Sequence, residues 1–315
     1  MSTRLAADVG GTNTRMALYD SSSNEFRALA TFTNRDYKNF EDVVAQWLGD
    51  LKEQAPVQAC IAIAAIPSDD KISMTNMDWS FSCKDIAARF GFTDFRWIND
   101  FEGNALALPY LTEADSDTIQ AGVGSDRGKF AILGPGTGLG GATVETIAQT
   151  SHVCACEPGY TSLAPANDLE MEIVRNLLGR YTQVYAELLV SGPGLLRLYK
   201  TLNDITDSSC NAATPAQVSL LALSREDETA VLALNTFCAL LGSVAGDFCL
   251  STGSYGGLYL AGGIVPTMVP FLRESEFQQR FCDKGAMSGH LKRIPVYAIT
   301  TAHPGLIGAA HAPIR

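Results

Sequence analysis

Residues 5–18 read LAADVGGTNTRMAL, and residues 130–144 read FAILGPGTGLGGATV. Each stretch begins with the apolar residues of a buried strand, passes through a glycine-rich turn and resumes as a second strand. The chain therefore uses one unit, a strand, a glycine turn and a strand, twice. Two α/β lobes built on this unit would bring both turns to one cleft, so we expect a two-lobed α/β fold with an interlobe cleft.

The segments outside these two hairpins alternate between helix and strand patterns. Apolar residues at helical spacing predict helices at 40–52, 82–90, 167–178 and 215–223. Ser82 suits the N-cap of the second of these helices. Apolar runs predict strands at 58–66, 95–98, 255–261 and 295–299, and a last helical stretch begins at Gly305. Alternation of this kind favours α/β lobes over a sandwich or a bundle.

The composition is that of an acidic globular protein. Of the 315 residues, 46% are hydrophobic and 18% are charged, which suits two domains with cores of their own. The net charge of −11 and the pI near 4.8 argue against a nucleic-acid partner, whose phosphates would be repelled.

The eight cysteines are scattered and mostly flanked by apolar residues, as expected of free thiols in a reducing cytosol. Only Cys154 and Cys156, two residues apart, suggest a metal site. No second pair follows at the spacing of zinc ligands, so we do not expect a structural zinc.

Residues 231–250 are apolar and about as long as a membrane span, so they need separate consideration. Asn235, Ser243 and Asp247 interrupt the run, which favours the buried helix of a soluble domain. The N-terminus runs straight into a strand pattern without room for a signal peptide. We therefore expect a cytoplasmic protein without a membrane partner.

Residues 8–13, DVGGTN, place a carboxylate directly before two glycines at the end of a buried strand. Glycines let the backbone approach a phosphate and aim successive N–H groups at its oxygens. Asp8 could hold a magnesium ion through water. The alternative is an ordinary hairpin turn.

The second turn, residues 134–141, is neither a P-loop, since no Lys-Ser/Thr follows, nor a dinucleotide fingerprint. A glycine-dense hairpin between apolar strands can still form an anion-binding nest. Paired with the first turn, it indicates that each lobe grips part of a triphosphate.

Asp100 follows the strand predicted at 95–98, at the end of the strand where the sites of α/β sheets concentrate. A single aspartate there can accept the proton of an alcohol while that alcohol attacks a γ-phosphoryl group. The alternative is a helix N-cap, a position that aspartate suits equally well.

Five motifs occur in order along the chain. They are Asp8-Val9-Gly10-Gly11-Thr12, Trp97-Ile98-Asn99-Asp100-Phe101, Gly136-Thr137-Gly138-Leu139-Gly140, Ser191-Gly192-Pro193-Gly194 and Ala261-Gly262-Gly263-Ile264-Val265-Pro266. Together they resemble the bacterial glucokinase family, within the actin-like ATPase (hexokinase) superfamily, over nearly the whole chain. The resemblance implies the two-lobed actin-like ATPase (ribonuclease H-like) fold. We expect a small lobe of residues 1–109 and 298–315 and a large lobe of residues 110–297.

The resemblance also implies an ATP-dependent hexokinase, a glucokinase that phosphorylates the 6-hydroxyl of glucose. Asp100 is then the catalytic base, and the residues expected to bind sugar hydroxyls are Asn99, Glu157, Tyr160 and Glu187. The residues expected to bind ATP are Asp8, Gly10, Gly11, Thr12, Asn13, Gly136, Thr137, Gly138, Gly262 and Gly263. Mg²⁺ would accompany ATP at Asp8, and the implied assembly is a homodimer.

Two positions depart from the family pattern. The family has Glu-Gly-Gly-His where this chain has residues 157–160, EPGY, and the missing histidine normally touches the sugar. The Tyr160 hydroxyl can donate and accept, so the contact can survive with a changed reach. Met77 stands where a histidine is typical and cannot replace its hydrogen bonding, and upstream Ile66 separates the strand from Pro67. Neutral drift and an altered sugar preference or activity are both open interpretations.

Two alternatives to glucose phosphorylation follow from these departures. The chain is a kinase for another hexose or an N-acetyl sugar, or it is a sugar-sensing binding protein without turnover. Asp100 speaks against the sensor, which needs no base, whereas Tyr160 and Met77 speak for it.

Overall fold

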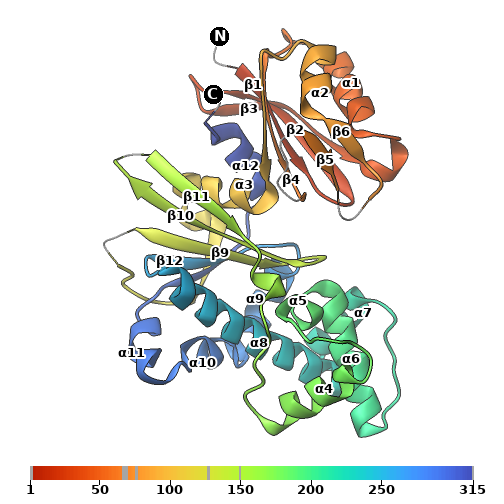
Figure 1. Ribbon diagram of the computed structural model, residues 1–315, viewed down its shortest axis with the longest axis vertical. Coiled ribbons are helices and arrows are strands. Elements are labelled where there is room, and N and C mark those ends of the chain that lie inside the picture. The colour runs from red at the N-terminus through yellow and green to blue at the C-terminus, as the bar shows by residue number, and fades with distance from the viewer. Residues whose placement is uncertain (1–2, 66–69, 75–76, 126–127, 149, 314–315) are drawn as a thin grey trace. The chain divides into compact units, whose positions relative to one another are not determined.

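The computed structural model describes residues 3–65, 70–74, 77–125, 128–148 and 150–313, a range that leaves out Ile66, Pro67, Thr75 and Asn76. The chain divides into two units (Figure 1). Unit 1 comprises Met1–Leu111 and Thr301–Arg315, and unit 2 comprises Thr112–Thr300. The positions of the units relative to one another are not determined, so the interlobe cleft stays a prediction.

Unit 1 is built on a five-stranded sheet in the order β3-β2-β1-β4-β7. Its strands are β1 (Thr3–Val9), β2 (Asn13–Asp20), β3 (Glu25–Thr33), β4 (Gln58–Ile63) and β7 (Asp94–Asn99). The first three form an antiparallel meander, and β4 and β7 continue the sheet parallel to β1. A small two-stranded sheet joins β5 (Lys71–Ser73) to β6 (Ser80–Ser82). The predicted strand, glycine turn and strand at residues 5–18 is confirmed.

The two faces of this sheet carry side chains of different size and so accept different helices. Large apolar residues on one face, including Leu5, Met16 and Ile61, form one core cluster with α1 (Phe40–Asp50) and α2 (Cys83–Phe90). The other face presents small residues to α3 (Asp100–Ala107) and α12 (Pro304–His311). Small residues permit close approach of backbones, and the two helices use it.

The contact between α3 and α12 depends on glycine. A Cβ at Gly308 would lie 1.7 Å from the Gly103 carbonyl oxygen, and a Cβ at Gly103 would lie 2.9 Å from the Ala62 Cβ. No larger residue fits at either position without moving the backbone. The start of α3, which carries Asp100, is therefore fixed against the sheet and α12.

Unit 2 is built on a six-stranded sheet in the order β11-β10-β9-β12-β13-β8. Its strands are β8 (Ser116–Gln120), β9 (Lys129–Pro135), β10 (Leu139–Ile147), β11 (Thr150–Cys156), β12 (Gly257–Leu260) and β13 (Val296–Ile299). Strands β9, β10 and β11 form an antiparallel meander, and β12 and β13 run parallel to β9. The order repeats that of unit 1 with β8 added antiparallel to β13. The second predicted hairpin is confirmed.

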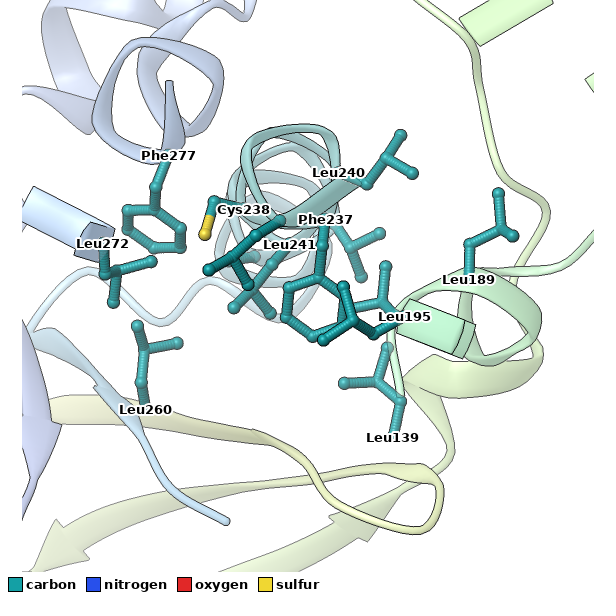
Figure 2. Packing of buried hydrophobic residues seen from close by; sticks show 14 of the residues in the cluster. Leu139, Leu189, Leu195, Phe237, Cys238, Leu240, Leu241, Leu260, Leu272 and Phe277 are labelled. Carbon is teal, nitrogen blue, oxygen red and sulfur yellow. The ribbon is translucent and has the colours of Figure 1, made fainter. Parts of the chain in front are cut away.

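The helices of unit 2 include one long apolar helix, α8. They are α4 (Asp168–Leu178), α5 (Ala186–Leu189), α6 (Gly192–Thr206), α7 (Pro215–Ser224), α8 (Glu228–Thr252), α9 (Val265–Glu274), α10 (Phe277–Cys282) and α11 (Ser288–Leu291). Helix α8 is the one helix of the described residues long and apolar enough to cross a membrane, and 72% of its most apolar window is buried inside the structure. Figure 2 shows its side chains packed among leucines from the sheet and from neighbouring helices. The predicted buried helix is confirmed.

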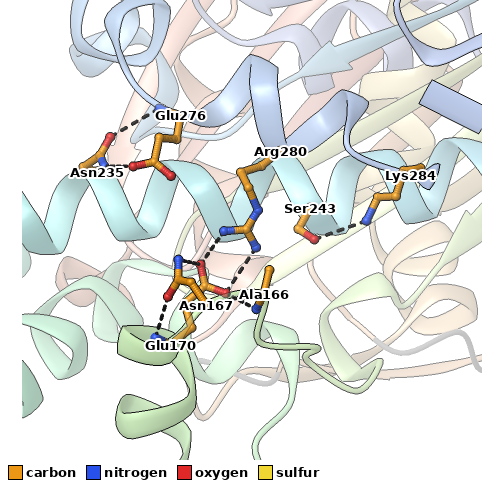
Figure 3. Close-up of polar contacts among 8 residues, drawn as sticks. All are labelled: Ala166, Asn167, Glu170, Asn235, Ser243, Glu276, Arg280 and Lys284. Atoms are coloured by element: carbon orange, nitrogen blue, oxygen red, sulfur yellow. Dashed lines mark hydrogen bonds and ion pairs between the residues drawn. The ribbon is translucent and has the colours of Figure 1, made fainter. Parts of the chain in front are cut away.

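A buried ion pair joins α4 to α10 (Figure 3). Both Nη groups of Arg280 donate hydrogen bonds to the Glu170 carboxylate, and the two side chains are 7% and 3% exposed. Glu170 also accepts from the Ala166 N–H at 2.7 Å and from the Asn167 side chain. A buried charge pair is tolerated when its remaining hydrogen-bond sites are filled in this way.

The observed element ends differ from the predicted ones by a few residues, and five strands, β3, β5, β6, β8 and β11, were not predicted. The strand predicted at 58–66 ends at Ile63, and the strand predicted at 255–261 begins at Gly257. The alternating apolar residues of β3, Phe26, Ala28, Ala30 and Phe32, are a signal for this strand, although most residues of the strand are exposed in the structure.

Candidate active site

Asn99 and Asp100 lie where β7 ends and α3 begins. The Asn99 Oδ1 accepts from the Phe101 N–H at 2.9 Å, so Asn99 is the N-cap and Asp100 is the first helical residue. The alternative that Asp100 serves as the N-cap is therefore wrong. The positive end of the helix dipole favours a carboxylate at this position.

Asp8, the last but one residue of β1, pairs with a cation across the hairpin. Its Oδ2 lies 3.4 Å from Arg15 Nη1 on β2. Burial raises the pKa of the Asp8 carboxyl, and the Arg15 charge opposes that rise. A Cβ at Gly305 would lie 3.0 Å from Asp8 Oδ1, so α12 begins directly beside this carboxylate.

The first glycine turn is held by Asn34, which the sequence analysis missed. The buried Asn34 side chain donates from Nδ2 to the Gly10 carbonyl at 2.7 Å and accepts at Oδ1 from Thr14 Oγ1 at 2.8 Å. Its own N–H donates to the Thr12 carbonyl at 2.9 Å. Asn34 lies just after the unpredicted strand β3, and no periodic pattern marks it.

A cavity of about 880 Å³ opens beside this turn. The residues that line it are Gly11, Thr12, Thr33, Asn34, Arg35, Met74, Met77 and Asp78. Met77, which stands where the family has a histidine, accepts at Sδ from Asn34 Nδ2 at 3.6 Å. Thioether sulfur is a weak acceptor, so the bond replaces little of what a histidine offers.

The surroundings of Asp8 fit an anion and its accompanying cation. Within the described residues, Arg15 Nε is buried without a hydrogen-bond partner, a donor that a phosphate oxygen would satisfy. The same residues contain no group of three or more His, Cys, Asp or Glu side chains arranged for a metal. Mg²⁺ that arrives with a nucleotide is commonly held by one or two carboxylates, phosphates and water, so a single Asp8 suits it.

The second glycine turn is held by backbone groups and one carboxylate. The Gly136 carbonyl accepts from the Gly192 N–H at 2.8 Å, and the Leu139 N–H donates to Glu187 Oε2 at 2.8 Å. Gly192 begins α6, whose N-cap is Ser191. Leu139 is buried with Leu195 and Phe237 (Figure 2), so the end of this turn is anchored in the core of unit 2.

Gly262 lies against the same turn from β12. Its φ of 91° is in the left-handed region, and a Cβ there would lie 2.4 Å from the Pro135 carbonyl oxygen. Gly263 has open space instead, with nothing within 4 Å of an added Cβ. The structure thus brings the predicted nucleotide residues of unit 2 together at the end of β9.

Glu157, Tyr160 and Glu187 gather beside the second turn. Burial and the Glu187 charge raise the pKa of Glu157, and the Glu187 charge and its hydrogen bond raise the pKa of Tyr160. The Tyr160 ring stacks on Tyr185 with centroids 5.6 Å apart, yet the residue is 61% exposed. Gly159, between Glu157 and Tyr160 in the sequence, has no room for a side chain, since a Cβ there would lie 2.6 Å from the Leu139 carbonyl oxygen.

The predicted site residues therefore form two groups. Unit 1 carries Asp8, Gly10, Gly11, Thr12, Asn13, Asn99 and Asp100, and unit 2 carries Gly136, Thr137, Gly138, Glu157, Tyr160, Glu187, Gly262 and Gly263. Arg15, Asn34 and Gly305 join the first group only through the structure. One group offers carboxylates near a strand end and a glycine turn; the other offers a glycine turn beside two glutamates.

Comparisons with known proteins agree on one family. The profile of the family described as Glucokinase matches residues 5–314. The glucokinase of Hahella chejuensis is 37% identical over 98% of this chain and 96% of its own length, and that of Chromobacterium violaceum is 39% identical over 98% and 88%.

Solved structures agree as well. The crystal structure of glucokinase from an Antarctic psychrotroph superposes with a TM-score of 0.87 at 37% identity, over 99% of this chain and 98% of the other. A glucokinase from Balamuthia mandrillaris in complex with glucose superposes with a TM-score of 0.85 at 22% identity, over 98% and 92%. The predicted actin-like ATPase class of α/β fold is confirmed. The chain belongs to the glucokinase family, and it is an ATP-dependent sugar kinase.

Proposed function

We propose that this kinase transfers the γ-phosphoryl group of MgATP to the 6-hydroxyl of glucose, with Asp100 as the catalytic base. The relatives named glucokinase support the acceptor, and a distant structural neighbour from Streptomyces griseus contains glucose and AMPPNP. The observation that carries the proposal is the geometry at the start of α3. Asn99 caps the helix, so capping does not account for the carboxylate at residue 100.

Asp100 accepts the proton of the sugar hydroxyl as its oxygen attacks phosphorus. General-base assistance of this kind typically accelerates a reaction by about 10²–10⁴-fold. Asn99 uses its side-chain oxygen for the cap, so we assign its amide nitrogen to a sugar hydroxyl. Glu157 and Glu187 accept hydrogen bonds from further hydroxyls, and Tyr160 lies beside them.

The two glycine turns, Gly10–Asn13 and Gly136–Gly138, bind the phosphates, and Gly262 and Gly263 lie against the adenosine. Arg15 Nε supplies a donor for a phosphate oxygen. Mg²⁺ supplies charge neutralisation on the β- and γ-phosphates when bound, and Asp8 is the residue that would hold it through water. Fixed N–H groups serve this reaction well because phosphoryl transfer depends on positioning and charge stabilisation.

We also infer a cytoplasmic homodimer that binds neither nucleic acid nor membrane. The net charge of −11 supports the exclusion of nucleic acid, and the buried α8 supports the exclusion of a membrane. Size-exclusion chromatography with light scattering would test the dimer.

Asp100→Asn tests the base. The variant removes the proton acceptor but keeps the size of the side chain, so we expect kcat to fall by about 10²–10⁴-fold while glucose binding stays nearly unchanged. Coupled measurement of ADP release and calorimetric binding of glucose report the two quantities. The matched control is Asp94→Asn at the opposite end of β7. An Asp100→Asn enzyme that keeps a tenth of wild-type turnover would disprove the role.

A panel of hexoses with MgATP tests the acceptor. We expect the highest kcat/KM with glucose. A higher kcat/KM with mannose, fructose or an N-acetyl sugar would identify that sugar as the substrate in place of glucose. The absence of turnover with all of them would favour the sensor. Tyr160→His sharpens the result, because a gain in glucose affinity would identify Tyr160 as the cause of a shifted preference.

A further inference from the structure

Two thiols lie side by side on strand β11, next to a residue of the proposed sugar site. Cys154 and Cys156 are two residues apart, so they project from the same face of the strand. Cys154 is exposed and Cys156 is partly exposed. The Cys156 thiol contacts the Cys154 carbonyl at 3.4 Å, and the two thiols interact with each other. The residue after Cys156 is Glu157.

We propose that Cys154 and Cys156 form a dithiol modification site that closes reversibly to an intrastrand disulfide and thereby lowers the affinity for the sugar. The second half of this statement rests on the proposed role of Glu157. The reagent class is a small-molecule disulfide such as oxidised glutathione.

The chemistry proceeds by two thiol–disulfide exchanges. The Cys154 thiolate attacks one sulfur of the reagent, forms a mixed disulfide and releases one thiolate. The Cys156 sulfur then attacks the Cys154 sulfur, forms the intrastrand bond and releases the second thiolate. The two cysteine protons go to the released thiolates or to solvent. The protein loses two electrons and the reagent gains them.

The local chemistry assigns the order of these steps. Burial and the neighbouring Cys154 raise the pKa of Cys156 to about 11, so this sulfur is mainly a neutral thiol near neutral pH. Cys154 is the more accessible of the two and is therefore the first to react. Lys129 opposes the rise at Cys156 and favours its thiolate in the second step.

Strand geometry makes the bridge labile. Two residues along a strand put the α-carbons about 6.6 Å apart, at the upper end of the range of about 4.4–6.8 Å seen for disulfides. Closing the bond therefore bends the strand and leaves a strained, easily reduced disulfide. Among the described residues, β11 pairs with β10 alone, so only one ladder resists the bend.

The bend would act on Glu157. Cys156 pairs with Gly141 at the last register position of β10 and β11, and Glu157 follows as the chain turns toward Tyr160. A change of strand direction at Cys156 displaces the Glu157 carboxylate from the hydroxyls it is proposed to bind. Glu187 and the second glycine turn are held from other elements and keep their positions.

The test treats the reduced full-length enzyme with oxidised glutathione and measures intact mass and peptide maps. We expect the wild type to lose two hydrogen masses and to carry the bridge between Cys154 and Cys156. Cys154→Ser and Cys156→Ser should form no bridge. Cys210→Ser removes another exposed thiol and should behave as the wild type. A stable glutathione adduct on the wild type, a bridge mapped elsewhere or a cross-link between chains would each overturn the modification site.

Kinetics of the bridged enzyme test the second half. We expect the KM for glucose to rise several-fold, the KM for ATP to change little, and dithiothreitol to restore the original values. A bridge that forms without a change in the glucose KM would overturn the link to sugar affinity. The mass readout needs no activity, and the glucose KM of Glu157→Gln tests the role of Glu157 separately. Failure of the dithiol and failure of the proposed function are thus distinguishable.

Discussion

The two glycine turns occupy the same place in two sheets of the same strand order, yet they are built from different groups. The second residue pair of the strand ladder, counted from the turn, is Asp8 opposite Arg15 in unit 1 and Gly134 opposite Gly140 in unit 2. The first turn is held by the side chain of Asn34, whereas the second is held by the Gly192 N–H and Glu187.

This difference indicates a division of work between the units. Unit 1 places a partly buried ion pair beside its turn, which suits the stabilisation of charge that moves during a reaction. Unit 2 holds its turn with the Gly192 N–H and the Glu187 carboxylate and anchors it in its core through Leu139, which suits rigid binding. A common topology positions a turn at the end of a sheet, and the residues around it decide its chemistry.

Among the variants that compare the two turns, the largest expected effect is that of Asp8→Asn, which removes the carboxylate of the Asp8–Arg15 ion pair. We expect kcat to fall by about 10²-fold or more, the loss typical of removing one electrostatic group from an active site. The fold should survive, because an amide can still accept from Arg15 and a buried neutral group is less costly than a charge. Steady-state kinetics and thermal unfolding measure the two outcomes.

Asp20→Asn is the matched control, since Asp20 lies at the opposite end of the same hairpin and pairs with Arg27. It should leave kcat unchanged. If Asp8→Asn kept a third of the activity, the charge pair would be a structural feature, and the two turns would work alike.

The sequence predicted what depends on local pattern. Both hairpins are marked by apolar runs around glycines, and the predicted cap of α2, Ser82, lies at the start of an apolar periodic segment. The roles of Asp100 and of the glycines come from the family resemblance and stay predictions. Asn99, rather than Asp100, is the N-cap of α3. The sequence could not decide between them, because asparagine and aspartate suit an N-cap equally.

The contacts that complete the turns could not be predicted because they join distant segments. Asn34 reaches Gly10 across 24 residues, and Glu187 reaches Leu139 across 48. Gly305 lies beside Asp8 at the other end of the chain. Such residues carry no periodicity of their own, and a buried asparagine resembles a loop asparagine in sequence.

Removing the side chain that holds each turn, Asn34 or Glu187, is expected to have a smaller effect. Asn34→Ala leaves the Gly10 carbonyl and the Thr14 hydroxyl without this partner, which costs about 1–3 kcal/mol of folding stability. We expect it to raise the KM for ATP several-fold and to leave the KM for glucose nearly unchanged. Glu187→Ala releases the Leu139 N–H and should raise both constants, because Glu187 also serves the sugar in our proposal.

Denaturant unfolding and kinetics with each substrate varied separately give these values. The control is Asn235→Ala, whose exposed side chain bonds Glu276 on the surface of unit 2 (Figure 3). Equal effects of Asn34→Ala on both substrates would mean that the first turn does not serve ATP selectively.

The smallest effect concerns the pH dependence of sugar binding in unit 2. Burial and the charge of Glu187 hold the pKa of Glu157 above its ordinary value, so its carboxylate is lost at a higher pH as the solution is acidified. Glucose affinity should fall with that protonation, since a neutral carboxyl accepts hydrogen bonds less well. Glu187→Gln removes the charge and leaves the burial, so the acid limb of the binding curve, where glucose affinity falls on acidification, should move to lower pH.

Direct binding of glucose without ATP is the measurement, because it does not require Asp100 as a base. Glu172→Gln, on the exposed side of α4, is the control and should leave the limb in place. If the pH at which glucose affinity falls were the same in Glu187→Gln as in the wild type, the charge of Glu187 would not act on Glu157 in sugar binding.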